Sequence, residues 1–137
     1  MRVFFDSSAF VKRYVSEAGT EEVLIWCDRA TEIGLSAIAL PEMISAFCRL
    51  QREGRIDDGQ YRHLKTALLA DVEDAAICDL TPAVLRQAVK CLESSVLRGM
   101  DAIHIGSALT LGVNVFVTAD QRQQEAALQA GLRVDLV

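Results

Sequence analysis

Short apolar runs alternate with longer amphipathic segments along this chain. Five apolar runs predict strands at residues 1–6, 33–39, 76–80, 113–120 and 132–137. Segments with a helical hydrophobic period predict helices at residues 7–15, 20–30, 40–54, 57–74, 81–95, 98–112 and 121–131. Strands that alternate with helices are typical of a parallel sheet covered on both faces. The pattern therefore predicts an α/β fold with a central, mostly parallel sheet of four to five strands flanked by helices.

Residues with known preferences for helix ends lie near the predicted boundaries. Thr20 and Thr81 are expected to cap helices at their N-termini, and Pro41 and Pro82 are expected at first helical positions. Gly54 is expected to end the helix that contains Pro41. These residues support the helix limits that the hydrophobic pattern predicts.

The composition is that of a folded chain without a membrane segment. Of the 137 residues, 51% are hydrophobic and 24% are charged, and no apolar run approaches the ~20 residues that a membrane helix needs. Asp6 interrupts the N-terminal apolar run, which argues against a signal peptide. Four widely spaced cysteines without a CxxC pair predict buried free thiols and a reducing cytoplasm. We expect a single domain over residues 1–137.

The net charge of −5 argues against binding of nucleic acid over the whole surface, but it allows local contacts. Five basic residues flank the candidate acidic positions described below, and they are candidates for contacts to phosphates: Lys12, Arg13, Arg49, Arg98 and Arg122. Solvated helix faces are the simpler interpretation of each of these residues.

Four acidic residues occupy the positions where an α/β sheet places its functional groups. Asp6 ends the first predicted strand, Glu42 lies in the first turn of a helix, Asp101 opens another helix, and Asp120 follows a strand. Functional groups of parallel sheets gather beyond the carboxyl ends of the strands, so we expect these four side chains to meet at one edge. Taken singly, each could instead be an ordinary helix cap.

Carboxylates at close range repel each other unless a cation lies between them. A set of hard oxygen ligands without a His or Cys partner favours Mg²⁺, with Mn²⁺ as a substitute, and phosphodiester hydrolysis is a natural reaction for such a site. Ser7 and Thr118 are candidates for hydrogen bonds to the carboxylates, although both could equally be turn or cap hydroxyls. His104 is expected to be packed rather than catalytic, and His63 is expected at the surface.

Four segments of the sequence resemble the PIN-domain family, and within it the VapC-type toxins of toxin–antitoxin pairs. They are residues 4–14, 40–49, 98–109 and 115–132, and they occur in the order of the family. The resemblance implies a PIN-like three-layer fold and a Mg²⁺-dependent endoribonuclease with Asp6, Glu42, Asp101 and Asp120 as metal ligands and catalytic residues. It also implies a homodimer that a cognate antitoxin inhibits.

The resemblance has two gaps. Gln121 stands where many relatives place a basic residue, and residues 51–79 match no motif. Two other functions stay open on sequence grounds. One is a Mg²⁺-dependent phosphatase or receiver-like phosphoacceptor, which usually has more acids after the first strand or a nearby lysine. The other is a non-catalytic PIN-fold module that binds a partner.

Overall fold

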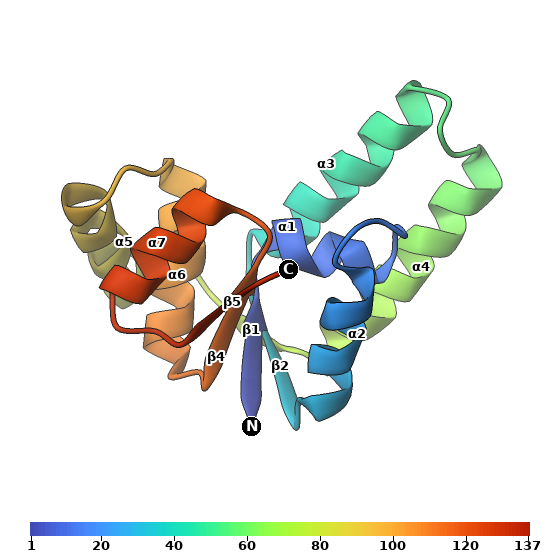
Figure 1. The fold of residues 1–137 in the computed structure, drawn as a ribbon. Coiled ribbons are helices and arrows are strands. Elements are labelled where there is room, and N and C mark those ends of the chain that lie inside the picture. The colour runs from blue at the N-terminus through green and yellow to red at the C-terminus, as the bar shows by residue number, and fades with distance from the viewer.

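The computed structural model describes all residues, Met1–Val137, and is built around a five-stranded sheet (Figure 1). The strands are β1 (Arg2–Phe5), β2 (Glu32–Ser36), β3 (Ala76–Cys78), β4 (Val115–Thr118) and β5 (Val134–Leu136). They lie in the order β3-β2-β1-β4-β5, and every neighbouring pair is parallel. The predicted α/β fold is confirmed, and the sheet is wholly rather than mostly parallel.

Helices cover both faces of the sheet. They are α1 (Ser7–Phe10), the 3₁₀ turn η1 (Val11–Arg13), α2 (Thr20–Arg29), α3 (Ala39–Arg52), α4 (Asp58–Asp74), α5 (Pro82–Ser94), α6 (Gly99–Leu111) and α7 (Gln121–Gln129). Figure 1 shows α2, α3 and α4 on one side of the sheet and α5, α6 and α7 on the other. None of these helices has both the length and the apolar composition needed to cross a bilayer.

The alternation of side chains along the central strands divides the core in two. Val3 and Phe5 of β1 pack with residues of α2, α3 and α4, whereas Phe4 packs with residues of α5, α6 and α7. Phe116 of β4 stacks on Phe4 with ring centroids 5.6 Å apart. Both strands are buried on their two faces, which explains why they appear in the sequence as continuous apolar runs.

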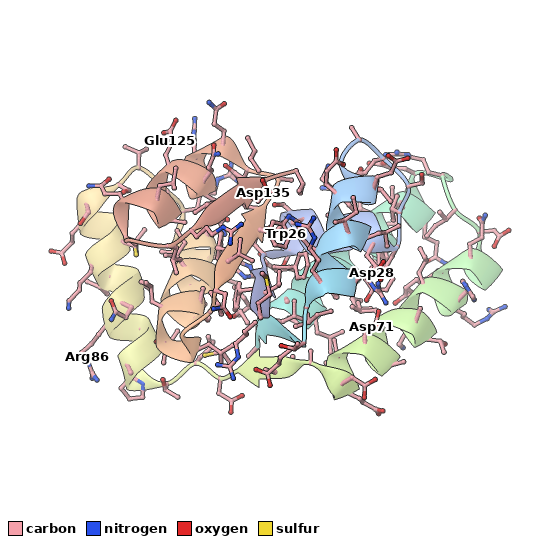
Figure 2. The ribbon with its side chains drawn as sticks, turned by 60° about the horizontal axis from the view of Figure 1, so that its bottom comes forward. Trp26, Asp28, Asp71, Arg86, Glu125 and Asp135 are labelled. Atoms are coloured by element: carbon pink, nitrogen blue, oxygen red, sulfur yellow. The ribbon has the colours of Figure 1, made fainter.

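The parallel sheet brings distant segments together at the edge where its strands end. The chain passes from β1 into α1, from β2 into α3 and from β4 into α7, so these three helices begin at that edge. Figure 1 shows that α6 also starts there and runs back along the sheet. At the outer strand, Trp26 of α2 donates a hydrogen bond from Nε1 to Oδ2 of Asp135 at 2.6 Å (Figure 2), which fastens β5 to α2.

Three local predictions about element boundaries are wrong. Thr20 is the first residue of α2 rather than its cap, since Gly19 takes the capping position at φ +95° and the Thr20 hydroxyl donates to the Lys12 carbonyl at 2.8 Å. Pro41 is the third residue of α3 rather than the first. The strand expected at residues 33–39 stops at Ser36, because the chain turns directly into α3.

The predicted cap at Thr81 and the predicted first helical position of Pro82 are confirmed, and so is the glycine stop after α3. Thr81 accepts the backbone N–H of Val84 at 3.3 Å, and Pro82 is the first residue of α5. Gly54 follows the cap of α3 at φ +70°. All four cysteines are free, but only Cys78 and Cys91 are buried, so the expectation of buried thiols holds for two of them.

The contact between α5 and α6 depends on a glycine. A Cβ at Gly106 would lie 2.7 Å from the Val84 carbonyl oxygen and 3.1 Å from the Ala88 nitrogen, and both of these atoms belong to the backbone of α5. We therefore expect Gly106→Ala to lower the free energy of unfolding by about 1–3 kcal/mol, measured by urea denaturation. Gly99→Ala is the matched control in the same helix, since its Cβ would meet nothing within 4 Å. Equal stability of the two variants would contradict this packing argument.

Candidate functional site

A polar pocket at the carboxyl edge of the sheet contains all four predicted acids. Asp6 enters it from the end of β1, Glu42 from the first turn of α3, Asp101 from the first turn of α6, and Asp120 from the end of β4. The other side chains that line the pocket are Ser7, Ser8, His104 and Gln123. No apolar residue lines it. The structure thus brings together acids that are separated by up to 114 positions in the sequence.

Asp6 is the most deeply placed of the acids, with 2% of its surface exposed. Its Oδ1 accepts the Ser8 hydroxyl at 2.7 Å and the Ala9 backbone N–H at 2.9 Å, and its Oδ2 accepts the Thr118 hydroxyl. Burial raises the pKa of the Asp6 carboxyl, and these hydrogen bonds oppose part of that rise. Asp6 is therefore held in one orientation by three donors and also caps α1.

Glu42 is oriented by two donors that share one of its oxygens. His104 Nε2 lies 2.6 Å from Glu42 Oε1, and the Ser7 hydroxyl donates to the same oxygen at 2.7 Å. Burial alone would raise the pKa of Glu42, but its contacts with His104 and Ser7 outweigh burial and hold that pKa below its usual value. The second oxygen, Oε2, accepts no hydrogen bond from the protein and is available to a ligand.

His104 is buried, as expected, with 2% of its surface exposed, and His63 is exposed, also as expected. The contact between His104 and Glu42 was not predicted from the sequence. The available signal was its position three residues after Asp101, on nearly the same face of α6. Ser8 was also missed. Its hydroxyl donates to Asp6 and accepts the Ala119 backbone N–H at 3.1 Å, so it joins the two strand ends.

Asp101 has no hydrogen-bond partner in the protein. It is the third residue of α6 and makes no capping bond, so the interpretation of Asp101 as an ordinary helix cap is wrong. Burial raises the pKa of its carboxyl, and the negative charges of Asp120 and Glu42 raise it further. Asp101 is thus a carboxylate at close range to other carboxylates with no bonded counter-group.

Asp120 combines a cap with an open oxygen. Its Oδ1 accepts the backbone N–H groups of Arg122 at 2.8 Å and Gln123 at 3.2 Å, so it has the cap role that the sequence left open for it. Its own backbone N–H donates to the Thr118 hydroxyl at 3.0 Å. Thr118 therefore touches two of the acids, and Ser7 touches a third. Both hydroxyls contact the acid cluster, in addition to any role in the local turns.

The donor set of this pocket suits a hard divalent cation, but the structure does not hold a ready-made ligand shell. No group of three or more His, Cys, Asp or Glu side chains is arranged to hold one ion. Mg²⁺ is commonly bound through one or two carboxylates, with water or substrate phosphate completing its octahedron. The open oxygens of Asp101, Glu42 and Asp120 fit that mode of binding.

The five basic residues that the sequence offered as phosphate contacts have different surroundings in the structure. Lys12 donates to the Ala18 carbonyl at 2.5 Å and pairs with Glu17, and Arg13 pairs with Asp71 at 2.9 Å, so neither is free to contact phosphate near the acids. These contacts favour a structural role for the two residues over a contact to phosphate. Arg98 and Arg122 instead line a second pocket together with Asp101 and Asp120. Arg49 is exposed and lines neither pocket.

An all-parallel sheet with an acidic pocket at its carboxyl edge is the arrangement of a PIN domain, and the model of the PIN domain family matches residues 3–128. The chain belongs to this family. Its homologues include Ribonuclease VapC45 and Ribonuclease VapC49 of Mycobacterium tuberculosis, each 34% identical over 141 residues that cover 96% of this chain and 93% of theirs. Ribonuclease VapC35 from the same organism is 29% identical and covers 96% of this chain and 94% of its own.

Solved structures share the fold at low sequence identity. The structure of FitAB bound to a DNA fragment has a TM-score of 0.71 at 16% identity, with 98% of this chain and 94% of that chain covered. VapC20 of Mycobacterium tuberculosis, described as a toxin that cleaves the sarcin–ricin loop, has a TM-score of 0.66 at 16% identity, with coverages of 90% and 94%. These similarities confirm the predicted PIN-like fold.

The unpartnered state of Asp101 generates a prediction about stability. A carboxyl whose pKa is raised by folding destabilises the folded protein when ionised, and this penalty disappears as pH falls through the raised pKa. We expect metal-free Asp101→Asn to unfold at a higher temperature than the wild type at pH 7, by circular dichroism in EDTA. The difference should shrink as the pH is lowered toward 4.

Asp28→Asn is the control for this comparison, because Asp28 is exposed on α2, on the other face of the sheet from α6 (Figure 2). It should leave the unfolding temperature unchanged at both pH values. An Asp101→Asn protein that unfolds at or below the wild-type temperature at pH 7 would show that the acid cluster is not electrostatically strained.

Proposed function

We propose that this chain is a Mg²⁺-dependent endoribonuclease of the VapC type, with Mn²⁺ as a possible substitute. The observation that carries the proposal is the pocket in which Asp6, Glu42, Asp101 and Asp120 meet, with Asp101 unpartnered beside two other acids. The homology to proteins named as ribonucleases supports RNA as the substrate. The proposal assigns all four acids to metal binding and catalysis.

The hydrogen bonds of the pocket determine which oxygen of each acid is available to a metal ion. Asp101 is the carboxylate with both oxygens open, so it is the principal ligand in this proposal. Glu42 offers Oε2, because His104 and Ser7 hold Oε1. Asp120 offers its Oδ2, because Oδ1 caps α7. Asp6 is fixed by Ser8, Ala9 and Thr118, and the second lone pair of its Oδ2 stays available.

The proposed reaction is hydrolysis of a phosphodiester bond. A Mg²⁺ ion in this pocket would supply a Lewis acid for the phosphate and would lower the pKa of the attacking water. The new bond forms between the water oxygen and phosphorus, and the bond from phosphorus to the 3′ oxygen breaks. One proton of the attacking water is transferred to an ionised acid, and the 3′ oxygen takes up a proton in return. The other proton of the water remains with the phosphate or is released to solvent. The products are a 5′-phosphate and a 3′-hydroxyl. The ionised acids are the groups positioned to accept a proton.

The rival chemistry of a phosphoacceptor or phosphatase is less well supported by this pocket. No lysine lines it, and Asp6 is the single acid contributed by the segment that follows β1. In addition, both oxygens of Asp6 already accept hydrogen bonds, which disfavours attack by this carboxylate on phosphorus.

Activity measurements on Asp101→Asn test the proposed function. We expect the wild type to cut RNA in Mg²⁺ or Mn²⁺, EDTA to stop the reaction, and Asp101→Asn to lower the rate by roughly a hundredfold or more. The measurement is gel analysis of single-stranded and folded RNA, with sequencing of the new ends. Asp28→Asn is the matched control and should cut at the wild-type rate.

Three outcomes would contradict this function. Cleavage by Asp101→Asn at the wild-type rate would remove Asp101 from the site. A wild type that neither cuts RNA nor binds Mn²⁺ in calorimetry would favour the non-catalytic module. Trapping of an aspartyl-phosphate on Asp6 would favour the phosphoacceptor.

We also propose that a cognate antitoxin inhibits this chain, and that this chain acts in the cytoplasm. Structures with the same fold include a toxin–antitoxin complex from Klebsiella pneumoniae and a VapBC2 complex from Rickettsia felis, and they support an antitoxin as the partner. Four unpaired cysteines suit a reducing compartment.

A homodimer is the proposed assembly, and one apolar surface supports it. Leu85, Val89 and Leu92 on α5 and Met100 on α6 are between 40% and 52% exposed, and they line one groove that also reaches Glu42, Arg98 and Asp101. A contiguous exposed apolar surface of this kind is typical of an interface, and a two-fold dimer would bury it on both copies.

The double variant Val89→Glu/Leu92→Glu tests this assembly. We expect light scattering to give the mass of two chains for the wild type and of one chain for the variant, because charges within an apolar interface are costly to desolvate. Leu128→Glu on α7 is the control at an exposed leucine that does not line this groove, and it should remain dimeric. A monomeric wild type, or a variant that stays dimeric, would contradict the proposed surface.

A further inference from the structure

The pocket beside the acids contains two cations that have no partner. Arg98 and Arg122 line it together with Leu97, Gln121, Asp101 and Asp120, and it shares these two acids with the carboxylate pocket. Neither guanidinium forms an ion pair within 4 Å, unlike those of Arg2, Arg13 and Arg55. Arg98 is the N-cap residue of α6, but its side chain makes no capping bond. Both side chains are therefore free to bind an anion.

Negative charge on the protein repels an RNA strand that approaches this site. The chain carries a net charge of −5, and four acids gather in one pocket. Phosphates next to the scissile bond would lie against these carboxylates unless cations stand beside them. The helices α6 and α7 both begin at the Arg98/Arg122 pocket, so the positive ends of their dipoles add to the charge of the two arginines.

We propose that Arg98 and Arg122 form a subsite that binds a phosphate of the RNA backbone adjacent to the bond that is cut. This inference rests on the proposed ribonuclease function and adds the side on which the strand is held. Each planar guanidinium can donate two parallel hydrogen bonds to phosphate oxygens, a geometry that lysine does not offer. The strand would then pass from the arginine pocket across Asp101 and Asp120 into the carboxylate pocket.

A simpler role for the arginines would be to balance the charge of Asp101 and Asp120, and the two roles predict opposite effects. If the arginines only offset the acids, their removal would strengthen the binding of a divalent cation and leave RNA binding unchanged. If they bind phosphate, their removal weakens RNA binding, whatever happens to the cation. Measuring both affinities on the same variant separates the two roles.

The test compares Arg98→Gln/Arg122→Gln with the control Arg62→Gln/Arg86→Gln, which removes the same charge from exposed positions on α4 and α5. Arg86 lies on the outer side of α5 (Figure 2), and neither control arginine has an ion-pair partner. The probe is a fluorescein-labelled single-stranded RNA of mixed sequence, measured by anisotropy in Ca²⁺ over a range of salt concentrations. Gel analysis confirms that the RNA stays intact, and Mn²⁺ affinity is measured by calorimetry.

We expect Arg98→Gln/Arg122→Gln to weaken RNA binding about tenfold and to reduce the slope of log affinity against log salt by about 0.7, the value for one lost phosphate contact on a single strand. The control should keep the wild-type affinity within about twofold. Wild-type RNA affinity and slope in the arginine variant would overturn the subsite, and so would an equal loss in the control. A wild type that cuts no RNA at all would instead overturn the proposed function, so the two failures are distinguishable.

Discussion

Repulsion among carboxylates at one edge of a parallel sheet is the constraint on which the rest of this structure depends. The sheet brings the ends of β1, β2 and β4 together, and the helices that begin there deliver acids into a single pocket. Three of the four acids are restrained by hydrogen bonds from nearby side chains or backbone, whereas Asp101 has none. Such a cluster costs folding energy, which a bound cation would recover.

The hydrogen bonds around the pocket give each acid a different capacity to bind a ligand. Glu42 and Asp120 each have one oxygen held by the protein and one left open, and Asp6 is restrained at both oxygens. A site of this kind presents few oxygens to any ion and leaves room for water and phosphate. That arrangement matches the way Mg²⁺ is commonly bound, and it explains why no three-residue ligand group is preformed.

The sequence predicted the fold and the meeting of the acids well, because both follow from local pattern and from a rule of parallel sheets. The continuous apolar runs of β1 and β4 and the order of strands and helices were visible in the chain itself. Details that depend on tertiary contacts were not visible. The start of α2 depends on a hydrogen bond from Thr20 to the Lys12 carbonyl. Arg13 forms an ion pair with Asp71, which is far away in the sequence. The contact between His104 and Glu42 joins residues of two helices that are 62 positions apart. The alternative of a cap at Asp101 was wrong because Arg98 occupies that position.

Anomalous diffraction from crystals soaked in Mn²⁺ tests the central claim most directly. We expect a peak in the pocket at coordination distance, about 2.0–2.2 Å, from an oxygen of Asp101 and of at least one other acid of the cluster. A crystal that shows manganese only on exposed acids elsewhere, or none at saturating concentration, would contradict the view that these carboxylates gather to bind a divalent cation.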